Sequence, residues 1–310
     1  SERPMITKEE LEENYKSLRK QVEEIFGFEV VNNYDWSKDI NFIDYLRDFG
    51  KYFSLNYMLA KETVKSRLDV GITYTEFSYM IMQALDFLWL YNNKNCVLQI
   101  GGQDQWGNIT AGLELARKKQ GTELFALTMP LILDTNGEKF GKSEGNALWL
   151  DQNLTSSYEM YQFFINQDDK MIIDYLKKLS FLSPEEIIDI EKEHQKKPEL
   201  RIAQKALAKD IITFLHGEDN YIKAVETSKQ IFMGNQTDDM PTVIIEDCNN
   251  ILEILIKANF STSKSDARRL IKQGGVSIDN KKILDPDYEE IKKEFILKKG
   301  KKSITKIILK

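Results

Sequence analysis

The sequence predicts an α/β fold with a parallel sheet, followed by a helical region and a compact α/β tail. Short apolar segments at residues 96–100 and 125–133 flank a helical pattern over residues 108–119, which is the order of a βαβ unit. From about residue 155 to residue 233 the apolar spacing is helical. Beyond residue 249 short alternating segments return. These observations divide the chain into regions of different architecture.

The first region is expected to begin with helices. Thr7-Lys8-Glu9-Glu10 has the spacing of a capping box, so a helix should start there and end near Gly27. A short strand is expected over residues 28–31, and helices over residues 39–48 and 55–67. A strongly apolar helix over residues 76–91 precedes the βαβ unit. The Asn136-Gly137 pair predicts a turn after the second strand.

Composition limits the class of protein. The chain has 310 residues, 42% of them hydrophobic and 30% charged, and no apolar run is long enough to span a bilayer. Cys96 and Cys248 give neither a disulfide framework nor a zinc spacing, which fits a reducing compartment. His194 and His216 lie in charged helical stretches and are expected to be solvent-exposed. The opening Ser-Glu-Arg-Pro resembles the middle of a loop, so we expect a fragment.

The charge is unevenly spread. Residues 249–310 hold 15 Lys and Arg against 8 Asp and Glu, a net charge of +7, and the rest of the chain carries −13. Within this tail a capped basic helix, ending at Gly274-Gly275, carries Arg268, Arg269 and Lys272 on one surface. Such a surface suits the phosphates of a polyanion. The alternative is a solvated charged helix, which the charge balance of the tail disfavours.

Residues 139–143, Lys-Phe-Gly-Lys-Ser, follow the predicted turn. Two ammonium groups and a hydroxyl on a glycine-containing loop are suited to a polyphosphate whose charge increases as it leaves. Lysine is abundant in this chain, so the string alone is also compatible with a solvated surface turn.

Three polar residues, Tyr79, Gln83 and Asp86, are aligned on the apolar helix over residues 76–91. Their spacing places them within an arc of about 60° on a helix that we expect to be buried. Buried polar groups need partners, so each one alone could simply contact a neighbouring element. Together they indicate a polar pocket for a small zwitterionic or hydroxylated ligand.

A glycine-rich turn, Gly101-Gly102-Gln103-Asp104-Gln105, follows the first predicted strand of the βαβ unit. Ligands of open α/β sheets bind outside the carboxyl ends of the strands, where glycines permit close approach. The Asp104 carboxylate there can accept a hydrogen bond from a ribose hydroxyl. An ordinary turn, with Asp104 near a helix start, is the alternative.

Four segments together, residues 61–67, 74–79, 101–110 and 139–143, resemble the bacterial-type tyrosyl-tRNA synthetases, which are class I enzymes. The tail resembles the small RNA-binding domain shared with ribosomal small-subunit protein four. The resemblance implies a Rossmann-like catalytic domain, incomplete at its N-terminus, over residues 1–150, including a dimer-forming insertion. It also implies a helical anticodon-recognition domain over 151–235, a linker over 236–248 and an RNA-binding domain over 249–310.

The resemblance assigns residues to tyrosine. Tyr79 and Gln83 would bind its α-ammonium group, Asp86 would accept from its phenolic hydroxyl, and Gln105 would lie near its carboxyl group. Residues that would contact ATP lie around the ribose, the adenine and the phosphates: Gly102 and Asp104; Leu131 and Ile132; Lys139, Lys142, Ser143 and Arg3. The RNA-binding residues would be Lys264, Arg268, Arg269 and Lys272.

The implied activity is that of a tyrosine–tRNA ligase, which forms tyrosyl-adenylate from L-tyrosine and ATP and transfers tyrosine to tRNA(Tyr). Mg²⁺ would accompany ATP without a protein-bound metal site. A homodimer is implied, with residues 42–74 at its interface, in the cytoplasm or the matrix of an organelle and without a membrane. The class signature His-Ile-Gly-His is absent from the sequence, so the N-terminal part that carries it is expected to be missing, and whether this chain is active by itself is left open. The alternative function is a non-catalytic RNA-binding protein derived from a synthetase.

Overall fold

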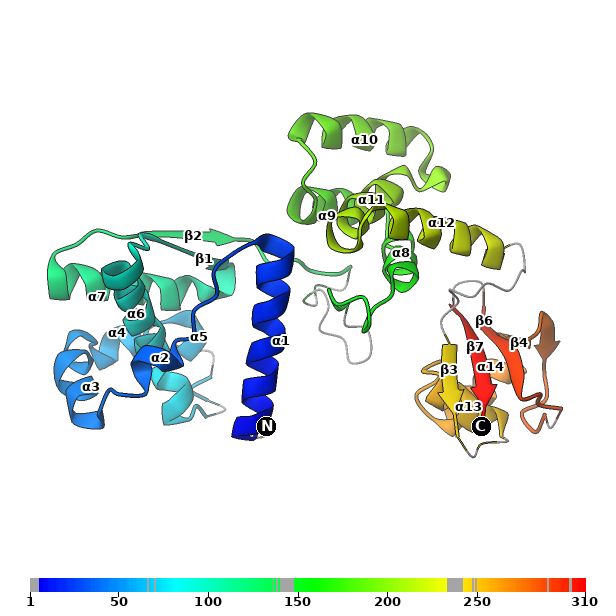
Figure 1. The fold of residues 1–310 in the computed structure, drawn as a ribbon, viewed down its shortest axis with the longest axis horizontal. Helices are drawn as coiled ribbons and strands as arrows, with labels where there is room; N and C mark the ends of the chain where they lie inside the picture. The colour runs from blue at the N-terminus through cyan, green and yellow to red at the C-terminus, as the bar shows by residue number, and fades with distance from the viewer. Residues whose placement is uncertain are drawn as a thin grey trace. The chain divides into compact units, whose positions relative to one another are not determined.

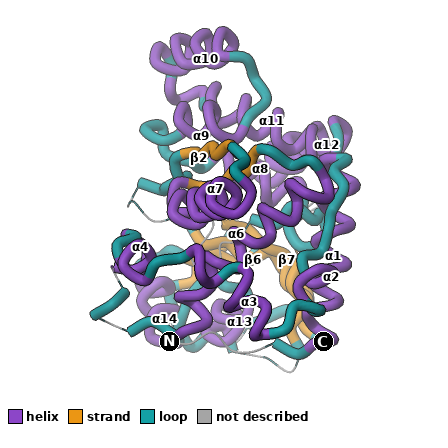
Figure 2. Tube along the Cα trace, turned by 90° about the vertical axis from the view of Figure 1, so that its left-hand side faces the viewer, coloured by secondary structure: helices purple, strands orange, loops and turns teal. Residues whose placement is uncertain are grey.

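The computed structural model describes residues 6–65, 67–69, 71–135, 137, 139, 148–232, 242–246, 248, 250–288, 290–300 and 303–310. It divides into two compact units, Ser1–Ile132 and Leu133–Lys310. Figure 1 colours the chain from blue at its N-terminus to red at its C-terminus. Helix predominates among the described residues (Figure 2). Their strands form one pair in the first unit and a five-stranded sheet in the second.

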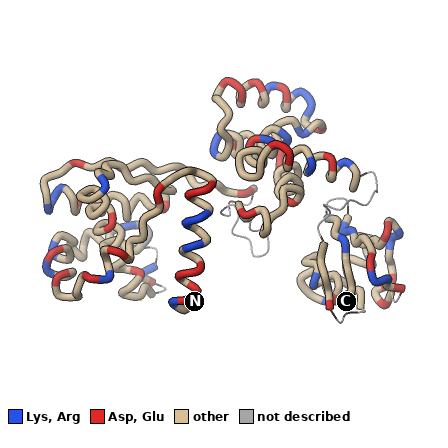
Figure 3. Tube along the Cα trace, viewed as in Figure 1, with Lys and Arg blue, Asp and Glu red and all other residues tan. Residues whose placement is uncertain are grey.

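The first helix, α1 (Lys8–Phe26), is bounded by the residues that predicted it. Thr7 Oγ1 accepts a hydrogen bond from the backbone N–H of Glu10 at 3.1 Å. Gly27 ends the helix with a φ of 67°, which glycine adopts without the usual steric cost. None of the residues of α1 is buried, and acidic and basic side chains are interspersed along it (Figure 3).

Short helices follow in place of the longer ones expected. They are α2 (Tyr34–Ser37), α3 (Phe42–Asp48), a 3₁₀ turn (Gly50–Tyr52), α4 (Leu55–Leu59) and α5 (Glu62–Lys65). The strand predicted over residues 28–31 is absent. A strand needs a neighbour for its backbone hydrogen bonds, and here Phe28 instead stacks on Phe26, with ring centroids 5.9 Å apart.

Helix α6 (Tyr74–Lys94) is the main helix of the first unit. Thr73 and Glu76 form a reciprocal capping box at its start, and Asn95 ends it in the left-handed conformation. Its apolar face packs against α7 (Trp106–Gln120). The contact is close because α7 has a glycine there: a Cβ on Gly112 would lie 2.9 Å from Cδ1 of Phe87.

The predicted βαβ unit is confirmed. Strand β1 (Leu98–Gly102) pairs in parallel with β2 (Phe125–Met129), in register from Leu98↔Phe125 to Gly102↔Met129, and α7 connects them. The strand boundaries differ from the prediction. β1 extends through both glycines instead of stopping before them, and β2 ends at Met129. A 3₁₀ turn, Gln103–Gln105, leads from β1 into α7.

The second unit begins with the helices that the apolar spacing predicted: α8 (Ser157–Ile165), α9 (Ile172–Leu179), α10 (Pro184–Lys196), α11 (Ile202–His216) and α12 (Glu218–Phe232). Their core includes the fully buried Ile172 and Leu207. The expectation that both histidines are solvent-exposed was wrong. His194 is only 4% exposed. His216 contacts Ser157 Oγ at 2.8 Å and the Leu150 carbonyl at 3.0 Å.

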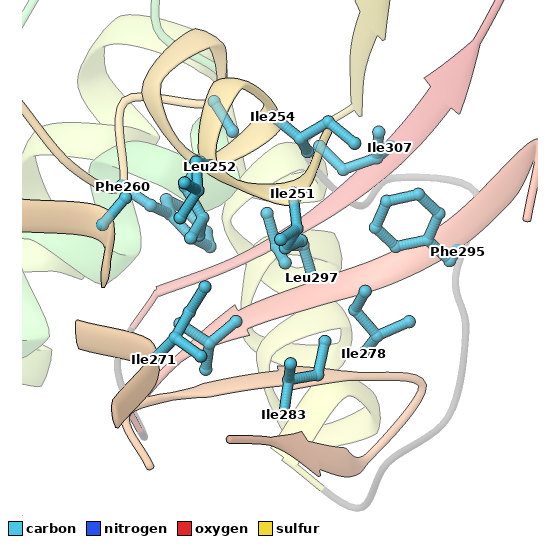
Figure 4. Close-up of a cluster of buried hydrophobic side chains, with 14 of the residues drawn as sticks. Ile251, Leu252, Ile254, Phe260, Ile271, Ile278, Ile283, Phe295, Leu297 and Ile307 are labelled. Carbon is cyan, nitrogen blue, oxygen red and sulfur yellow. The ribbon is translucent and has the colours of Figure 1, made fainter. Parts of the chain in front are cut away.

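The C-terminal part of the second unit packs two helices, α13 (Ile251–Lys257) and α14 (Lys264–Lys272), against a sheet. The sheet has the order β3 (Thr242–Ile245), β7 (Ser303–Leu309), β6 (Glu294–Lys299), β4 (Val276–Ile278), β5 (Lys281–Ile283). Figure 4 shows the apolar core between helices and sheet, with Ile251 and Leu297 near its centre.

Part of the segment predicted as a linker, residues 236–248, belongs to this sheet. Strand β3 lies within it and pairs in parallel with β7, from Thr242↔Lys306 to Ile245↔Leu309. The polar and proline-containing residues before Thr242 suggested a linker, but Thr-Val-Ile-Ile is β-branched and apolar, which favours a strand. The compact C-terminal part therefore begins at β3 and not at residue 249.

Candidate active site

The polar residues of α6 lie away from its packed face. Met80, Ala84 and Phe87 are buried, whereas Tyr79 is 57% exposed and Gln83 and Asp86 are only partly buried. The expectation that this helix is buried was therefore wrong for this face. The alignment of the three polar side chains on one face stands, since their separations of four and three residues place them on adjacent turns.

Asp86 is held by two hydrogen bonds from a distant segment. Asn33 Nδ2 donates to Oδ2 at 3.0 Å, and the indole N–H of Trp36 donates to Oδ1 at 2.8 Å. Both donors come from α2 and its N-cap, about 50 residues earlier in the chain. A carboxylate offers about four lone-pair sites, so these two bonds fix its orientation and leave capacity to accept a further hydroxyl proton.

The sequence analysis missed Asn33 and Trp36. A signal was present: Asn32-Asn33-Tyr34-Asp35-Trp36 puts a tryptophan in a short polar stretch between two helical patterns. A tryptophan in such a place needs an apolar surface and an acceptor for its N–H. The sequence does not indicate that the acceptor is Asp86, because that pairing depends on the tertiary fold.

The turn between β1 and α7 brings several predicted residues together. A Cβ on Gly102 would lie 2.8 Å from Oδ1 of Asp104 and 3.0 Å from Cδ2 of Leu131. Only glycine fits such an approach without a shift, so Gly102, Asp104 and Leu131 meet at the carboxyl ends of β1 and β2. Gln105 accepts a hydrogen bond from Asn108 Nδ2 at 3.3 Å, and Ile132 follows Leu131, partly buried.

Two of the segments that carry the family resemblance are in direct contact. Lys61 Nζ donates to Thr110 Oγ1 at 3.2 Å and lies 4.2 Å from the ring centroid of Tyr57. The hydrogen bond joins the start of residues 61–67 to the end of residues 101–110. Residues 61–67 and 101–110 are therefore parts of one structure in the first unit.

The predicted phosphate-binding residues are described only in part. Lys139 is partly buried and forms an antiparallel bridge with Leu133. Gly137 lies between them with a φ of 80°, and its N–H donates to the Asp134 carbonyl at 3.1 Å, as expected of a turn. Lys142, Ser143 and Arg3 lie outside the described residues.

Helix α14 presents its basic side chains to solvent. Ala267 and Ile271 face the core, while Lys264, Arg268, Arg269 and Lys272 are all exposed. Two of these cations have acidic partners: Lys264 pairs with Glu253 at 2.6 Å, and Arg269 pairs with Asp266 at 2.7 Å. The ion pair holds the pKa of Glu253 below its ordinary value, through the hydrogen bond from Lys264 and its charge.

Neither a metal-binding cluster nor a membrane-spanning helix occurs in the described part of the chain. No group of three or more His, Cys, Asp or Glu side chains there is placed to hold a metal ion. None of its helices combines the length and the apolar character that crossing a membrane requires.

Two family models match the chain in succession. One, described as tRNA synthetases class I (W and Y), matches residues 1–233. The other, described as the tyrosine–tRNA ligase SYY-like C-terminal domain, matches residues 233–307. The change from one model to the other falls between α12 and β3.

Curated relatives and a solved structure agree with these models. The tyrosine–tRNA ligase of Listeria innocua serovar 6a is 43% identical over 327 aligned positions, which cover 97% of this chain and 78% of the relative. That of Streptococcus uberis is 45% identical, covering 93% of this chain and 74% of the relative. A C-terminally truncated mitochondrial tyrosyl-tRNA synthetase of Aspergillus nidulans matches with a TM-score of 0.58 and 28% identity, over 74% of this chain and 70% of that chain.

Proposed function

The chain belongs to the tyrosyl-tRNA synthetase family of class I enzymes, and we propose that the polar face of α6, with the turn after β1, binds the tyrosine that it activates. Its function is that of a tyrosine–tRNA ligase, an aminoacyl-tRNA synthetase. The relatives favour this function over that of a non-catalytic RNA-binding protein. The observation that carries the proposal is the environment of Asp86, whose carboxylate is oriented by two donors and retains acceptor capacity.

The Asp86 carboxylate accepts a hydrogen bond from the phenolic hydroxyl of tyrosine. Phenylalanine lacks that hydroxyl and would leave the oriented carboxylate without its ligand partner, which discriminates more strongly than an apolar pocket can. Tyr79 and Gln83 lie on the same face of α6 and bind the α-ammonium group. Gln105, at the start of α7, contacts the carboxyl group of the substrate.

ATP binds at the carboxyl ends of the two parallel strands. Gly102 lets the ribose approach the backbone, and Asp104 accepts from a ribose hydroxyl. Leu131 and Ile132 provide apolar contacts for the adenine. The phosphates are contacted by residues that carry positive charge or a hydroxyl: Lys139, Lys142, Ser143 and Arg3.

The reaction needs positioning and charge stabilisation. A carboxylate oxygen of tyrosine attacks the α-phosphorus of ATP, the bond to the bridging oxygen of the β-phosphate breaks, and pyrophosphate leaves with the bonding electrons. Lys139 and Lys142 stabilise the charge that develops on this leaving group. ATP enters as its magnesium complex. In a second displacement, the terminal ribose of tRNA(Tyr) attacks the activated carbonyl carbon and releases AMP.

The remaining regions serve tRNA binding and assembly. The C-terminal part, with the exposed cations of α14, binds tRNA phosphates, and the helices over residues 151–235 contact the anticodon. The segment over residues 42–74 forms a homodimer interface in the cytoplasm or an organellar matrix. Its exposed apolar side chains support that role: Phe42, Ile43, Leu55 and Tyr74 are each more than 60% exposed.

The test of the tyrosine site is Asp86→Asn, assayed by amino-acid-dependent ATP–pyrophosphate exchange. A hydrogen bond to a charged group is worth about 3 kcal/mol at most, so the ratio of kcat/KM for tyrosine over phenylalanine should fall by roughly 100-fold. The KM for ATP should stay close to that of the wild type. An unchanged ratio would place the recognition of the phenol elsewhere.

A further inference from the structure

A stacked tryptophan pair lies beside Asp86. The rings of Trp36 and Trp89 are 4.0 Å apart between centroids and inclined by 10°. Trp36 belongs to α2 and donates its indole N–H to Asp86. Trp89 belongs to α6, three residues after Asp86 and therefore on an adjacent turn.

Helix α2 cannot fix the direction of the Trp36 N–H by itself. It has four residues, which is too short for a helix to be stable in isolation. None of its residues is buried. The segment must therefore be held against α6 by its side-chain contacts, or the hydrogen bonds to Asp86 would be made only part of the time.

Among the described residues, an ion pair and a ring stack hold the segment from Glu29 to Trp36 against α6, besides the hydrogen bonds to Asp86. One is the ion pair of Glu29 with Lys94 at 2.7 Å, whose side chains are 70% and 41% exposed. An exposed ion pair contributes little and leaves the chain free to pivot. The other is the stack of Trp36 on Trp89, which has a defined plane. The stack is therefore the contact that can fix orientation.

The plane matters because an indole N–H lies in the plane of its ring. A parallel neighbour prevents the Trp36 ring from tilting, and this leaves the N–H aimed at Asp86 Oδ1 at 2.8 Å. Asn33 donates separately to Oδ2 at 3.0 Å. The hydrogen bond to Oδ1 thus depends on the ring plane that Trp89 provides.

We propose that Trp89 is a positioning residue for the choice of tyrosine over phenylalanine. It acts through Trp36, whose N–H orients the Asp86 carboxylate for the phenolic hydroxyl. This inference rests on the proposed role of Asp86 as the group that accepts from tyrosine. The proposed role of Trp89 requires no contact with the substrate or the reacting atoms.

The first experiment compares Trp89→Leu with Trp89→Phe in tyrosine- and phenylalanine-dependent ATP–pyrophosphate exchange. Trp89→Leu removes the ring and keeps apolar bulk, so the tyrosine/phenylalanine ratio of kcat/KM should fall about tenfold, mainly through the KM for tyrosine. Trp89→Phe keeps a ring and should stay within about threefold of the wild type. The KM for ATP should not change, whereas a general loss of structure would alter it.

The decisive measurement is a double-mutant cycle with Trp36→Phe, which keeps a ring for stacking and removes the N–H. If Trp89 acts through that N–H, adding Trp89→Leu to Trp36→Phe should lower the ratio by no more than about twofold further. A full tenfold further loss, or a wild-type ratio in Trp89→Leu alone, would overturn the proposal. Tyr91→Phe is the control on the same helix, since it removes only the contact of Tyr91 with Thr122 at 3.1 Å, and its ratio should equal that of the wild type.

Near-ultraviolet circular dichroism checks the stack directly, because two parallel indoles couple. The coupled signal should be present in the wild type, absent in Trp89→Leu and unaffected in Tyr91→Phe. If Trp89→Leu does not fold, the cycle is run with Trp89→Met, which also lacks a ring, and the same criteria apply. A wild-type enzyme without tyrosine-dependent exchange would refute the proposed function itself. An active enzyme with a ratio insensitive to Trp89 would refute only this inference.

Discussion

Helices α6 and α14 both present the side chains that we propose for binding on one exposed face, but these side chains obtain their partners differently. On α6, Asp86 is bound by Asn33 and Trp36, which are 53 and 50 residues away in sequence. On α14, Arg269 pairs with Asp266 of its own previous turn. Lys264 pairs with Glu253, 11 residues away.

The difference matches what we propose that each surface recognises. Two long-range hydrogen bonds, one of them partly buried, fix a carboxylate in one orientation, and this is needed to distinguish one hydroxyl group. Exposed local ion pairs have low energies and reform readily, so a phosphate can replace the carboxylate partner of Arg269 at little cost. The first surface is therefore suited to specificity, and the second to contact with a polyanion of variable shape.

The largest expected effect comes from removing the second surface altogether. Deleting residues 233–310 should weaken tRNA binding by roughly 100-fold at low salt, because several phosphate contacts are lost together. Tyrosine-dependent ATP–pyrophosphate exchange should stay within about twofold of the full chain, since Asp86 and its partners lie in the first unit. Filter binding of tRNA and exchange kinetics measure the two quantities.

The position of the cut matters. A deletion that starts at residue 249 would keep β3 and remove β7, its partner in the sheet, and would expose an unpaired apolar strand. The deletion of residues 233–310 should therefore be compared directly with the deletion of residues 249–310. Loss of exchange in the deletion of residues 233–310 would show that the two surfaces do not act independently.

The second prediction concerns the orientation of Asp86. Asn33→Ala removes the donor to Oδ2 and leaves the Trp36 bond in place. A lost hydrogen bond to a charged group costs about 1.5 kcal/mol, so the tyrosine/phenylalanine ratio should fall about tenfold. Exchange assays measure it, and tRNA affinity serves as the control because it should not change. An unchanged ratio would mean that Trp36 alone orients the carboxylate.

Much of the fold could be predicted from local patterns. The capped ends of α1, the βαβ unit and the helices from α8 to α12 follow from residue spacing and turn chemistry, and the structure agrees with each. Strand boundaries were less predictable. The strand expected at residues 28–31 is absent and β3 was taken for a linker, because a strand is decided by its neighbour in space, which the sequence does not specify.

The residues of the candidate site divide in the same way, into those that local patterns predict and those that depend on tertiary contacts. Tyr79, Gln83 and Asp86 share a helix, so their alignment follows from the helical period. Gly102 and Asp104 were predicted from the rule that ligands bind at strand ends, whereas Leu131 came from the family resemblance; the structure brings the three together. Asn33, Trp36 and Trp89 could not be found in this way. Their contacts join α2 to α6 and depend on how a short exposed segment packs.

The third prediction separates paired from unpaired cations on α14. Among the described residues Arg268 has no acidic partner within ion-pair distance, whereas Arg269 is paired with Asp266. Arg268→Gln should weaken tRNA binding about fivefold and reduce the slope of log affinity against log salt by about one. Arg269→Gln should cost less, about twofold, because its charge is already partly compensated.

Asp266→Asn gives the reciprocal test of that pair. Freeing Arg269 should strengthen tRNA binding about twofold at low salt, an effect that fades as salt rises. Lys16→Gln is the matched control, because Lys16 is an exposed cation paired with Glu12 at 2.8 Å on α1, and tRNA affinity should not respond to it. Equal losses for Arg268→Gln and Arg269→Gln would contradict the idea that local pairing reduces the contribution of a cation.

The smallest expected effect tests whether the local contacts of α6 matter for its specificity. The N–H of Thr73 and the guanidinium of Arg67 hold the pKa of Glu76 below its ordinary value, at the start of α6. A carboxyl group with a lowered pKa in the folded state stabilises the fold above its unfolded-state pKa, and that stability disappears as the pH falls through the folded-state pKa. Glu76→Gln should therefore lower the Tm by roughly 1–2 °C at pH 7 and by less at pH 3.

The tyrosine/phenylalanine ratio of kcat/KM should not change in Glu76→Gln, because Asp86 is oriented from α2. If Glu76→Gln lowered that ratio as far as Asn33→Ala does, the contrast between long-range orientation on α6 and local pairing on α14 would fail.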